Sequence, residues 1–364
     1  MRRVKVIGAG SIGNHLAQAA RRIGWSVAIV DANPKALERT KNEIYPQRYG
    51  KWDESIKLYE TGKEPRGGYD VIFIGTPPDV RMKLALDALE EKPKIIQLEK
   101  PLCGPYPTGR ALLSEFMSAY SCQRHTKVVV GYDHAVSESV SYVADLLDEW
   151  LIGEVQTIDV EFREHWRGIF SAHPWLSGPE DTYLGYTARG GGASGEHSHA
   201  LHLWQLFARR AGCGVPNRIC GFLKWEKAST EHSPCASYDS IAAFTIETDK
   251  KMIGRVVQDV ITYPPRKWAR IQGSKGSIEW MCNGAVQGGD LVGVRVKNLS
   301  LLEVPFLKTR QDDFYQEMLH IEDILDGKTS AEDSPISFES GVLVMKMLAT
   351  VGMYGDTAMR SITF

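Results

Sequence analysis

The stretch VKVIGAGSIGNHL, residues 4–16, decides the fold of the N-terminal part of this chain. It begins with a short apolar run that ends at three glycines, and apolar side chains then recur at near-helical spacing as far as residue 23. This pattern predicts a buried strand, a tight turn and a helix. In such a turn Gly8 permits the reversal of the chain, Gly10 leaves room beside the backbone, and Gly13 lets the helix pack on the strand.

A turn of this kind suits the pyrophosphate of a dinucleotide, because the first N–H groups of the helix, near Ser11 and Ile12, are free to bind phosphate. The next apolar strand ends in Asp31, whose carboxylate can accept hydrogen bonds from the adenosine ribose and would repel a 2′-phosphate. The sequence therefore predicts NAD, with NADP less favoured, although Lys35 or Arg39 could soften that preference. The alternative is a glycine turn and a capping aspartate without a ligand.

The order of apolar runs indicates two domains. The strand expected at residues 4–7 is followed by helical patterns that alternate with further strand candidates at 26–30, 71–75, 95–98 and 127–131. This alternation predicts a parallel, doubly wound sheet, and hence an α/β Rossmann domain over residues 1–131. Residues 132–364 differ: helical stretches at 139–150, 313–326 and 340–357 flank alternating runs expected to be antiparallel strands, at 156–162, 241–247 and 252–260.

Composition excludes some partners. A formal net charge of -2 over 364 residues gives no electrostatic reason to expect nucleic acid or an anionic membrane as a partner. The chain shows no signal-peptide pattern and no apolar run of membrane-spanning length, so we expect a cytoplasmic protein. Its cysteines form no CxxC pair and are expected to be reduced, mostly buried thiols; they stand at positions 103, 122, 213, 220, 235 and 282.

Two short motifs follow strands of the first domain. GTPPD, residues 75–79, lies at the carboxyl end of a strand, where open α/β sheets bind ligands. LEKP, residues 98–101, follows the next apolar run, and Pro101 favours an extended backbone that directs Lys100 away from the sheet edge. We expect the cofactor to be contacted from these two motifs by Thr76, Pro77, Pro78, Glu99 and Lys100.

A second cluster that can carry chemistry is GGGASGEHSHALHLW, residues 190–204. Glu196 and His199 are three residues apart, so in one helix they would share a face and the carboxylate could orient the imidazole. An imidazole is suited to accept the proton of an alcohol that loses hydride, while Lys100 would stabilise the developing alkoxide. Zinc binding by the histidines is a weaker alternative, because the spacing is not HExxH, and we expect no metal. We expect His202 to be a buried histidine of the core or of an interface.

An aromatic insertion between residues 162 and 195 suits a sugar or polyol, whose C–H faces stack on rings while its hydroxyls bond to polar groups. The candidate substrate contacts there are Arg167, Trp175 and Tyr183, within a set that includes Arg163, Trp166, His173 and Tyr186. The alternative is an aromatic core or subunit contact. The insertion's arginines, including Arg189, could hold a carboxylate or phosphate, or could be solvated or salt-bridged.

The ordered set of motifs, GAGSIG, GTPPD, LEKP, VVVGYDH and GGGA to HALHLW, resembles the Gfo/Idh/MocA family of oxidoreductases over nearly the whole chain. The resemblance implies a C-terminal domain with a large, mainly antiparallel open sheet that often builds a homodimer or homotetramer. It also implies NAD(P)-linked chemistry on a hydroxyl of a sugar, sugar derivative or cyclitol. Lys100 and His199 would then be the catalytic pair, and Asp133 and His134 would lie close to the substrate.

The chain departs from the family pattern in three places. Gly195 stands where an aspartate is usual four residues before the histidine, and Glu196 is the nearest carboxylate. Arg81 and Ala135 replace a usual histidine and a common arginine. Two other hypotheses stay open: an enzyme that keeps its NAD bound, as a sugar oxidoreductase or a glycosidase acting through a transient ketone, and a nonenzymatic dinucleotide sensor.

Overall fold

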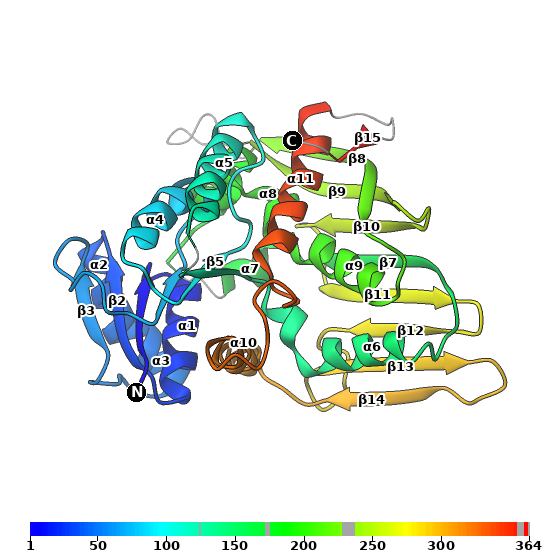
Figure 1. Cartoon of the computed structure of the whole chain (residues 1–364), viewed down its shortest axis with the longest axis horizontal. Helices are drawn as coiled ribbons and strands as arrows, with labels where there is room; N and C mark the ends of the chain where they lie inside the picture. The colour runs from blue at the N-terminus through cyan, green and yellow to red at the C-terminus, as the bar shows by residue number, and fades with distance from the viewer. Residues whose placement is uncertain (124, 172–174, 228–236, 355–359, 363–364) are drawn as a thin grey trace. The chain divides into compact units, whose positions relative to one another are not determined.

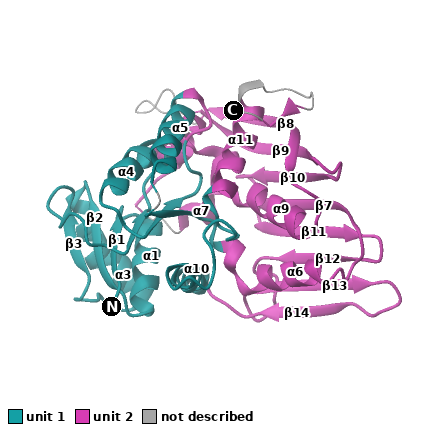
Figure 2. Ribbon diagram, viewed as in Figure 1, with its two compact units in different colours: residues 1–103, 108–133, 310–338 teal, residues 104–107, 134–309, 339–364 magenta. Residues whose placement is uncertain are grey.

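The computed structural model describes residues 1–123, 125–171, 175–227, 237–354 and 360–362, and Figure 1 labels most of their helices and strands. The chain forms two compact units, coloured in Figure 2. Unit 1 comprises residues 1–103, 108–133 and 310–338; unit 2 comprises residues 104–107, 134–309 and 339–364. The backbone therefore passes from one unit to the other several times. The division at residue 131 stays a prediction of which part binds the cofactor and which binds the substrate.

Unit 1 contains a six-stranded sheet in the order β3-β2-β1-β4-β5-β6, with every neighbouring pair parallel. Its strands are β1 (Arg3–Ile7), β2 (Ser26–Asp31), β3 (Lys57–Glu60), β4 (Val71–Ile74), β5 (Ile95–Glu99) and β6 (Lys127–Gly131). The predicted doubly wound parallel sheet is confirmed. Only β3 was not foreseen, because it is a four-residue edge strand with no fully buried residue and no apolar run.

The helices of unit 1 begin where the sequence supplies suitable first residues. They are α1 (Ser11–Arg22), α2 (Pro34–Arg39), a π-helical turn (Thr40–Ile44), α3 (Tyr45–Tyr49), α4 (Pro78–Glu90), α5 (Pro107–Ser121) and α10 (Arg310–Leu325). Pro34 and Pro78 stand in the first turns of α2 and α4, where a missing N–H costs no helical hydrogen bond. Although α10 is distant in sequence, it packs against α1, where His15 and Phe314 stack with ring centroids 4.6 Å apart.

Unit 2 is built on a nine-stranded sheet in the order β14-β13-β12-β11-β7-β10-β9-β8-β15. Its strands are β7 (Val155–Arg163), β8 (Pro216–Lys227), β9 (Ser237–Thr248), β10 (Ile253–Asp259), β11 (Arg266–Gly273), β12 (Gly276–Met281), β13 (Asp290–Val296), β14 (Leu302–Phe306) and β15 (Arg360–Ser361). The prediction of a large, mainly antiparallel sheet is confirmed. One pair differs, because β7 and β10 run parallel.

One face of this sheet is covered by helices. α9 packs on β7 and β10, α8 on β9 and β10, and α6 on β12 and β13. The helices of unit 2 are α6 (Glu138–Asp148), α7 (Trp166–Ser171), α8 (Gly192–Glu196), α9 (His199–Arg210) and α11 (Phe338–Tyr354). Along β7, residues Ile158, Val160 and Phe162 are buried, whereas the residues between them are partly exposed. This period of two shows that the opposite face of β7 carries the polar residues.

No helix in the described part of the chain combines the length and the apolar character that a bilayer crossing requires. Among the described residues, no disulfide bond is formed by Cys103, Cys122, Cys213, Cys220 or Cys282. Cys235 and His173 lie outside the described residues.

Candidate active site

The turn between β1 and α1 has the geometry that the glycine spacing predicts. Gly8 has φ +108°, and a Cβ there would lie 3.0 Å from the carbonyl oxygen of Gly75. A Cβ on Gly13 would lie only 1.9 Å from the carbonyl oxygen of Gly8, so the close approach of strand and helix requires glycine at both positions. By contrast, a Cβ on Gly10 would meet no atom within 4 Å. The space beside Gly10 is open, as a pyrophosphate at the start of α1 requires.

Two side chains that the sequence did not single out hold this turn. The Asn14 amide donates to the carbonyl oxygens of Ala9 and Gly10, at 3.0 and 2.7 Å. Arg48, from α3, donates to the Ser11 hydroxyl at 2.9 Å and so brings a guanidinium to the first residue of α1. Ser11 is buried and Ile12 is partly exposed beside it. No local pattern marks Arg48, because its contact with Ser11 is made across 37 residues of chain.

Asp31, the last residue of β2, lies next to the same turn. Its carboxylate accepts from the backbone N–H groups of Ala9 and Asn33, both at 2.7 Å. Each carboxylate oxygen accepts one of these bonds and retains a further lone pair for a ribose hydroxyl. The residues around this turn therefore fit the adenosine end of NAD.

The GTPPD loop is fixed by the residue that departs from the family pattern. Thr76 is partly exposed, Pro77 is exposed, and the buried Pro78 begins α4. Arg81 is 2% exposed, and its guanidinium donates to the carbonyl oxygens of Thr76 and Pro101. Arg81 thereby joins this loop to the LEKP loop.

In the LEKP loop, Lys100 is partly exposed, whereas Glu99 is buried. Glu99 pairs across the sheet with Gly131, where a Cβ would lie 2.2 Å from a carboxylate oxygen of Glu99. The glycine at this position of β6 makes room for the acidic side chain. Burial raises the pKa of Glu99, an effect that the Arg81 guanidinium opposes.

Unit 1 also contains a cluster of charged groups close to Glu99 of the LEKP loop. Asp133 is 2% exposed and forms an ion pair with Arg310 of α10, which also binds Asp313 at 3.1 Å. Glu317, also from α10, is fully buried, and burial together with the Glu99 carboxylate raises its pKa well above the usual range. The expected substrate residue Asp133 is thus already engaged by an arginine, a contact that only the packing of α10 creates.

Within unit 2, His199 is the first residue of α9 and is buried among aromatic rings. Its imidazole stacks on Phe162, with centroids 6.0 Å apart, and meets the His134 ring edge-on at 4.9 Å. The structure therefore brings the candidate residues His134 and His199 together. The carbonyl oxygen of His197, just before α9, accepts a hydrogen bond from the side chain of Gln258 on β10.

Glu196 and His199 do not share one helix. Glu196 is the last residue of α8 and His199 the first of α9, so the expected common helical face is replaced by a turn. The missing aspartate of the family also has a steric explanation. A Cβ on Gly195 would lie 2.0 Å from the carbonyl oxygen of Gly190, which leaves no room for a side chain at this position.

The glycine-rich segment before His199 is held by a buried acid, Asp239 of β9. Its carboxylate accepts from the Thr187 hydroxyl at 2.8 Å, and from the N–H and hydroxyl of Ser194 at 2.7 and 3.1 Å. A Cβ on Gly192 would lie 2.1 Å from the same carboxylate. Burial raises the pKa of Asp239 to about 6, although these hydrogen bonds stabilise the ionised form.

Some side chains of the aromatic insertion pack in a small core cluster, and others have exposed surface. Trp166 belongs to a small core cluster with Ile169, Leu184, Ala193 and Val260, and Tyr183 packs against that cluster. The packing of Trp166 and Tyr183 agrees with the alternative interpretation, in which the insertion is an aromatic core loop. Trp175 is partly exposed and Arg167 is exposed, so both have surface available to a ligand.

Two further expectations concern basic side chains of unit 2. Arg163 forms an ion pair with Asp259 at 2.5 Å, as the salt-bridged alternative anticipated. His202 is 1% exposed and lies 3.1 Å from the Ser340 hydroxyl, as expected for a buried histidine.

Comparison with known proteins agrees with this geometry. Residues 2–132 match the model of the oxidoreductase family with an NAD-binding Rossmann fold, GFO_IDH_MocA. No curated protein resembles the chain closely enough in sequence to count as a match.

Among solved structures, a levoglucosan dehydrogenase in complex with NADH and L-sorbose is 15% identical, with a TM-score of 0.76 over 100% of this chain and 99% of its own. A putative myo-inositol dehydrogenase from Sinorhizobium meliloti 1021 is 19% identical, with a TM-score of 0.70 and full coverage of both chains. An oxidoreductase domain protein from Kribbella flavida is 16% identical, with a TM-score of 0.74 and 99% of each chain covered.

Residues 2–132 are thus the Rossmann segment of a nicotinamide-dependent oxidoreductase, and NAD is its cofactor. The segment matches the Gfo/Idh/MocA family model, the family that the sequence motifs resemble, and the whole chain shares the fold of the three structures above.

Proposed function

We propose that this protein is an NAD-dependent dehydrogenase that oxidises a secondary hydroxyl of a sugar, sugar derivative or cyclitol. The observation that carries the proposal is the NAD-binding family segment, whose β1–α1 turn is open beside Gly10 and flanked by Asp31. The full-length fold shared with structures named as levoglucosan and myo-inositol dehydrogenases supports the substrate class.

Bound NAD would supply the hydride acceptor. The pyrophosphate would be held at the β1–α1 turn by Gly8, Gly10, Ser11, Ile12 and Gly13. Asp31 would bind the ribose, and the GTPPD loop would contact the cofactor through Thr76, Pro77 and Pro78. The Lys100 ammonium would stabilise negative charge on the substrate oxygen, and His199 would accept the hydroxyl proton. Glu99, which is buried beside Lys100, would contact the cofactor. The substrate would be bound or positioned by Asp133, His134, Arg167, Trp175, Tyr183 and Glu196.

The test is NADH formation over a panel that includes levoglucosan and inositols, for wild type, Lys100→Met and His199→Asn. Loss of either group should lower kcat by about 10²- to 10⁴-fold, the usual contribution of a positioned acid or base. Lys83→Met, at an exposed lysine on α4, is the control and should turn over at the wild-type rate.

Three results would overturn the proposal. Turnover by Lys100→Met at the wild-type rate would remove the ammonium from the chemistry. NAD that copurifies and never exchanges would indicate an enzyme that oxidises and re-reduces within one cycle. NAD binding without turnover of any polyol, together with a protein partner, would indicate a sensor.

We further propose that the protein is a homo-oligomer assembled through the helix-free face of the unit 2 sheet. Polar, partly exposed side chains of β7, such as Asp159 and Glu161, lie on that face. A cytoplasmic location is supported by the free thiols among the described cysteines.

A further inference from the structure

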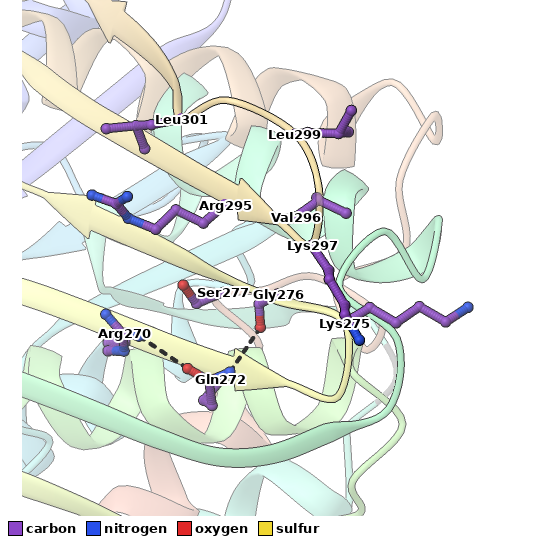
Figure 3. A pocket seen from close by; sticks show the side chains of 10 residues that line it. All are labelled: Arg270, Gln272, Lys275, Gly276, Ser277, Arg295, Val296, Lys297, Leu299 and Leu301. Carbon is purple, nitrogen blue, oxygen red and sulfur yellow. Dashed lines mark hydrogen bonds between the residues drawn. The ribbon is translucent and has the colours of Figure 1, made fainter.

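A surface pocket of about 400 Å³ lies at one end of β11, β12 and β13, far along the chain from every candidate catalytic residue (Figure 3). Four of its lining side chains are cationic: Arg270, Lys275, Arg295 and Lys297. None of the described residues that line it is acidic. Figure 3 shows the two arginines on one side of the pocket and the two lysines near the turns on the other.

Strand register explains why a pocket forms here. Gln272 of β11 pairs with Ser277 of β12, which pairs with Arg295 of β13, so the three side chains form one row on the same face of the sheet. In the adjacent row β13 contributes Gly293, which has no side chain, and Leu301 approaches this position to 3.8 Å from where a Cβ would stand. The row of Gln272, Ser277 and Arg295 therefore borders the pocket with hydrogen-bond donors.

Hydrogen bonds hold Gln272 and Arg270 in place in the wall of the pocket. Gln272 accepts from the Arg270 guanidinium at 3.0 Å and donates to the Gly276 carbonyl oxygen at 3.0 Å, as the dashed lines in Figure 3 show. The Arg270 guanidinium is also held by an ion pair with Glu279.

Three of the four cations of the pocket differ from the other cations on this sheet. Arg255 pairs with Asp159 at 2.7 Å, Arg163 with Asp259, and Arg266 with Glu161 at 3.5 Å, all from neighbouring strands. For Lys275, Arg295 and Lys297, by contrast, no carboxylate of the described residues lies within ion-pair distance. Three unmatched positive charges around one concave site repel one another, and a multivalent anion would relieve that repulsion.

We propose that this pocket binds a small phosphorylated molecule, with its phosphate oxygens held by Arg295, Lys275 and Lys297 and by the Ser277 hydroxyl. Guanidinium and ammonium donors around a hydroxyl suit a phosphate group with several oxygens. The apolar side chains of Val296 and Leu299 would border the uncharged part of the molecule. The site uses no catalytic or cofactor residue of the dehydrogenase proposal, but it lies on the helix-free face of the unit 2 sheet, which is also the face of the proposed subunit contact, so the titration is read together with sedimentation of the same samples.

The test is calorimetric titration of the full chain with inorganic pyrophosphate in the presence of saturating NAD, which occupies the other phosphate-binding site. The double variant R295Q/K297Q should weaken pyrophosphate binding by about tenfold or more, since two of the nearest charges are lost. Lys83→Gln, at an exposed lysine of unit 1, should bind pyrophosphate as wild type does. Binding to wild type should also weaken as salt is raised.

Equal binding by wild type and R295Q/K297Q, or no binding by either, would overturn the proposal. Sedimentation of the same samples tests whether a second copy of the chain, rather than a small molecule, occupies the pocket. If a second copy of the chain supplied the anionic group instead, wild type would not bind pyrophosphate and R295Q/K297Q would sediment as a smaller species.

Discussion

Arg81 connects two loops of the candidate site through backbone carbonyl groups. Its buried guanidinium donates to Thr76 and to Pro101, so a neutral side chain of similar length would leave two carbonyl oxygens without their donor. Each such group costs about 1–3 kcal/mol when it is buried. We therefore expect Arg81→Met to lower the free energy of unfolding by roughly 2–5 kcal/mol, measured by urea denaturation, and to weaken NAD binding.

Lys83→Met is the matched control for Arg81→Met, because Lys83 lies on the same helix and is exposed. It should change the free energy of unfolding by less than about 0.5 kcal/mol. Wild-type stability and NAD affinity in Arg81→Met would show that the two loops hold their conformation without the arginine.

Asp239 predicts a pH dependence of stability. Burial raises its pKa from 3.8 to about 6, so between these values the folded state binds a proton that the unfolded state has released. The contribution of Asp239 is therefore favourable at low pH and is lost as pH rises through about 6; a shift of about two pKa units corresponds to roughly 3 kcal/mol. Asp239→Asn should remove this decline, compared by urea denaturation at pH 4, 5 and 6.

A second measurement separates the charge of Asp239 from its hydrogen bonds. Near neutral pH, the side-chain amide of the variant D239N could still accept from Thr187 but would place an N–H against the Ser194 N–H. We expect His199-dependent turnover to fall because the segment before α9 loosens. Identical pH profiles of stability for wild type and D239N would contradict the assignment.

The turn between β1 and α1 allows two glycines to be compared within one motif. Gly10→Ala places a methyl group in open space at a backbone φ of -77°, so folding should be unaffected, but the methyl would occupy the room of the pyrophosphate. Gly13→Ala places a methyl 1.9 Å from the Gly8 carbonyl oxygen and should destabilise unit 1. Thermal unfolding and NAD titration by fluorescence distinguish the two effects.

The expected pattern is wild-type thermal stability with weakened NAD binding for Gly10→Ala, and reduced stability for Gly13→Ala. If Gly10→Ala bound NAD as tightly as wild type, the cofactor could not lie against this turn. Loss of stability in both variants would mean that the space beside Gly10 is filled in solution.

Elements with strong local signals were predictable from the sequence. The strands β1, β2, β4, β5 and β6 lie where apolar runs precede glycine or polar turns. The strands β8 and β11 to β14 were not among the expected strands, although charged residues such as Arg270 and Glu279 alternate with apolar ones there as in a half-buried strand. The break between α8 and α9 was also missed, because the pattern of apolar residues does not record the two-residue turn at His197 and Ser198.

The sequence predicted those side chains of the candidate site that belong to a recognisable motif. Asp31 lies at the β1–α1 turn, as the motif predicted, and His134 lies beside His199, a contact that the sequence did not predict. Arg48, Arg81 and Asp239 reach the candidate residues only through packing, across separations that no local pattern spans. The same holds for Arg310, whose helix joins unit 1 from late in the sequence.

At the scale of the whole molecule, unit 1 is not continuous in sequence. Residues 310–338 complete it, and α10 packs on α1. A fragment that ends at residue 131 would lack α10 and would expose the α1 surface that meets Phe314. We expect this fragment to aggregate or to bind NAD much more weakly than the full chain, as measured by NAD titration. A monomeric, NAD-binding fragment would show that α10 is dispensable.

The proposed homo-oligomer makes the last prediction, which concerns the helix-free face of the unit 2 sheet. Trp268 of β11 is half-buried there, beneath the Arg266 guanidinium at 4.5 Å. A large aromatic ring among paired charges is the kind of residue that contributes most to a subunit interface. Trp268→Ala should therefore shift sedimentation velocity toward a smaller species, whereas Trp150→Ala, at a 64% exposed tryptophan after α6, should not. A wild-type protein that sediments as a monomer at every concentration would contradict assembly through this face.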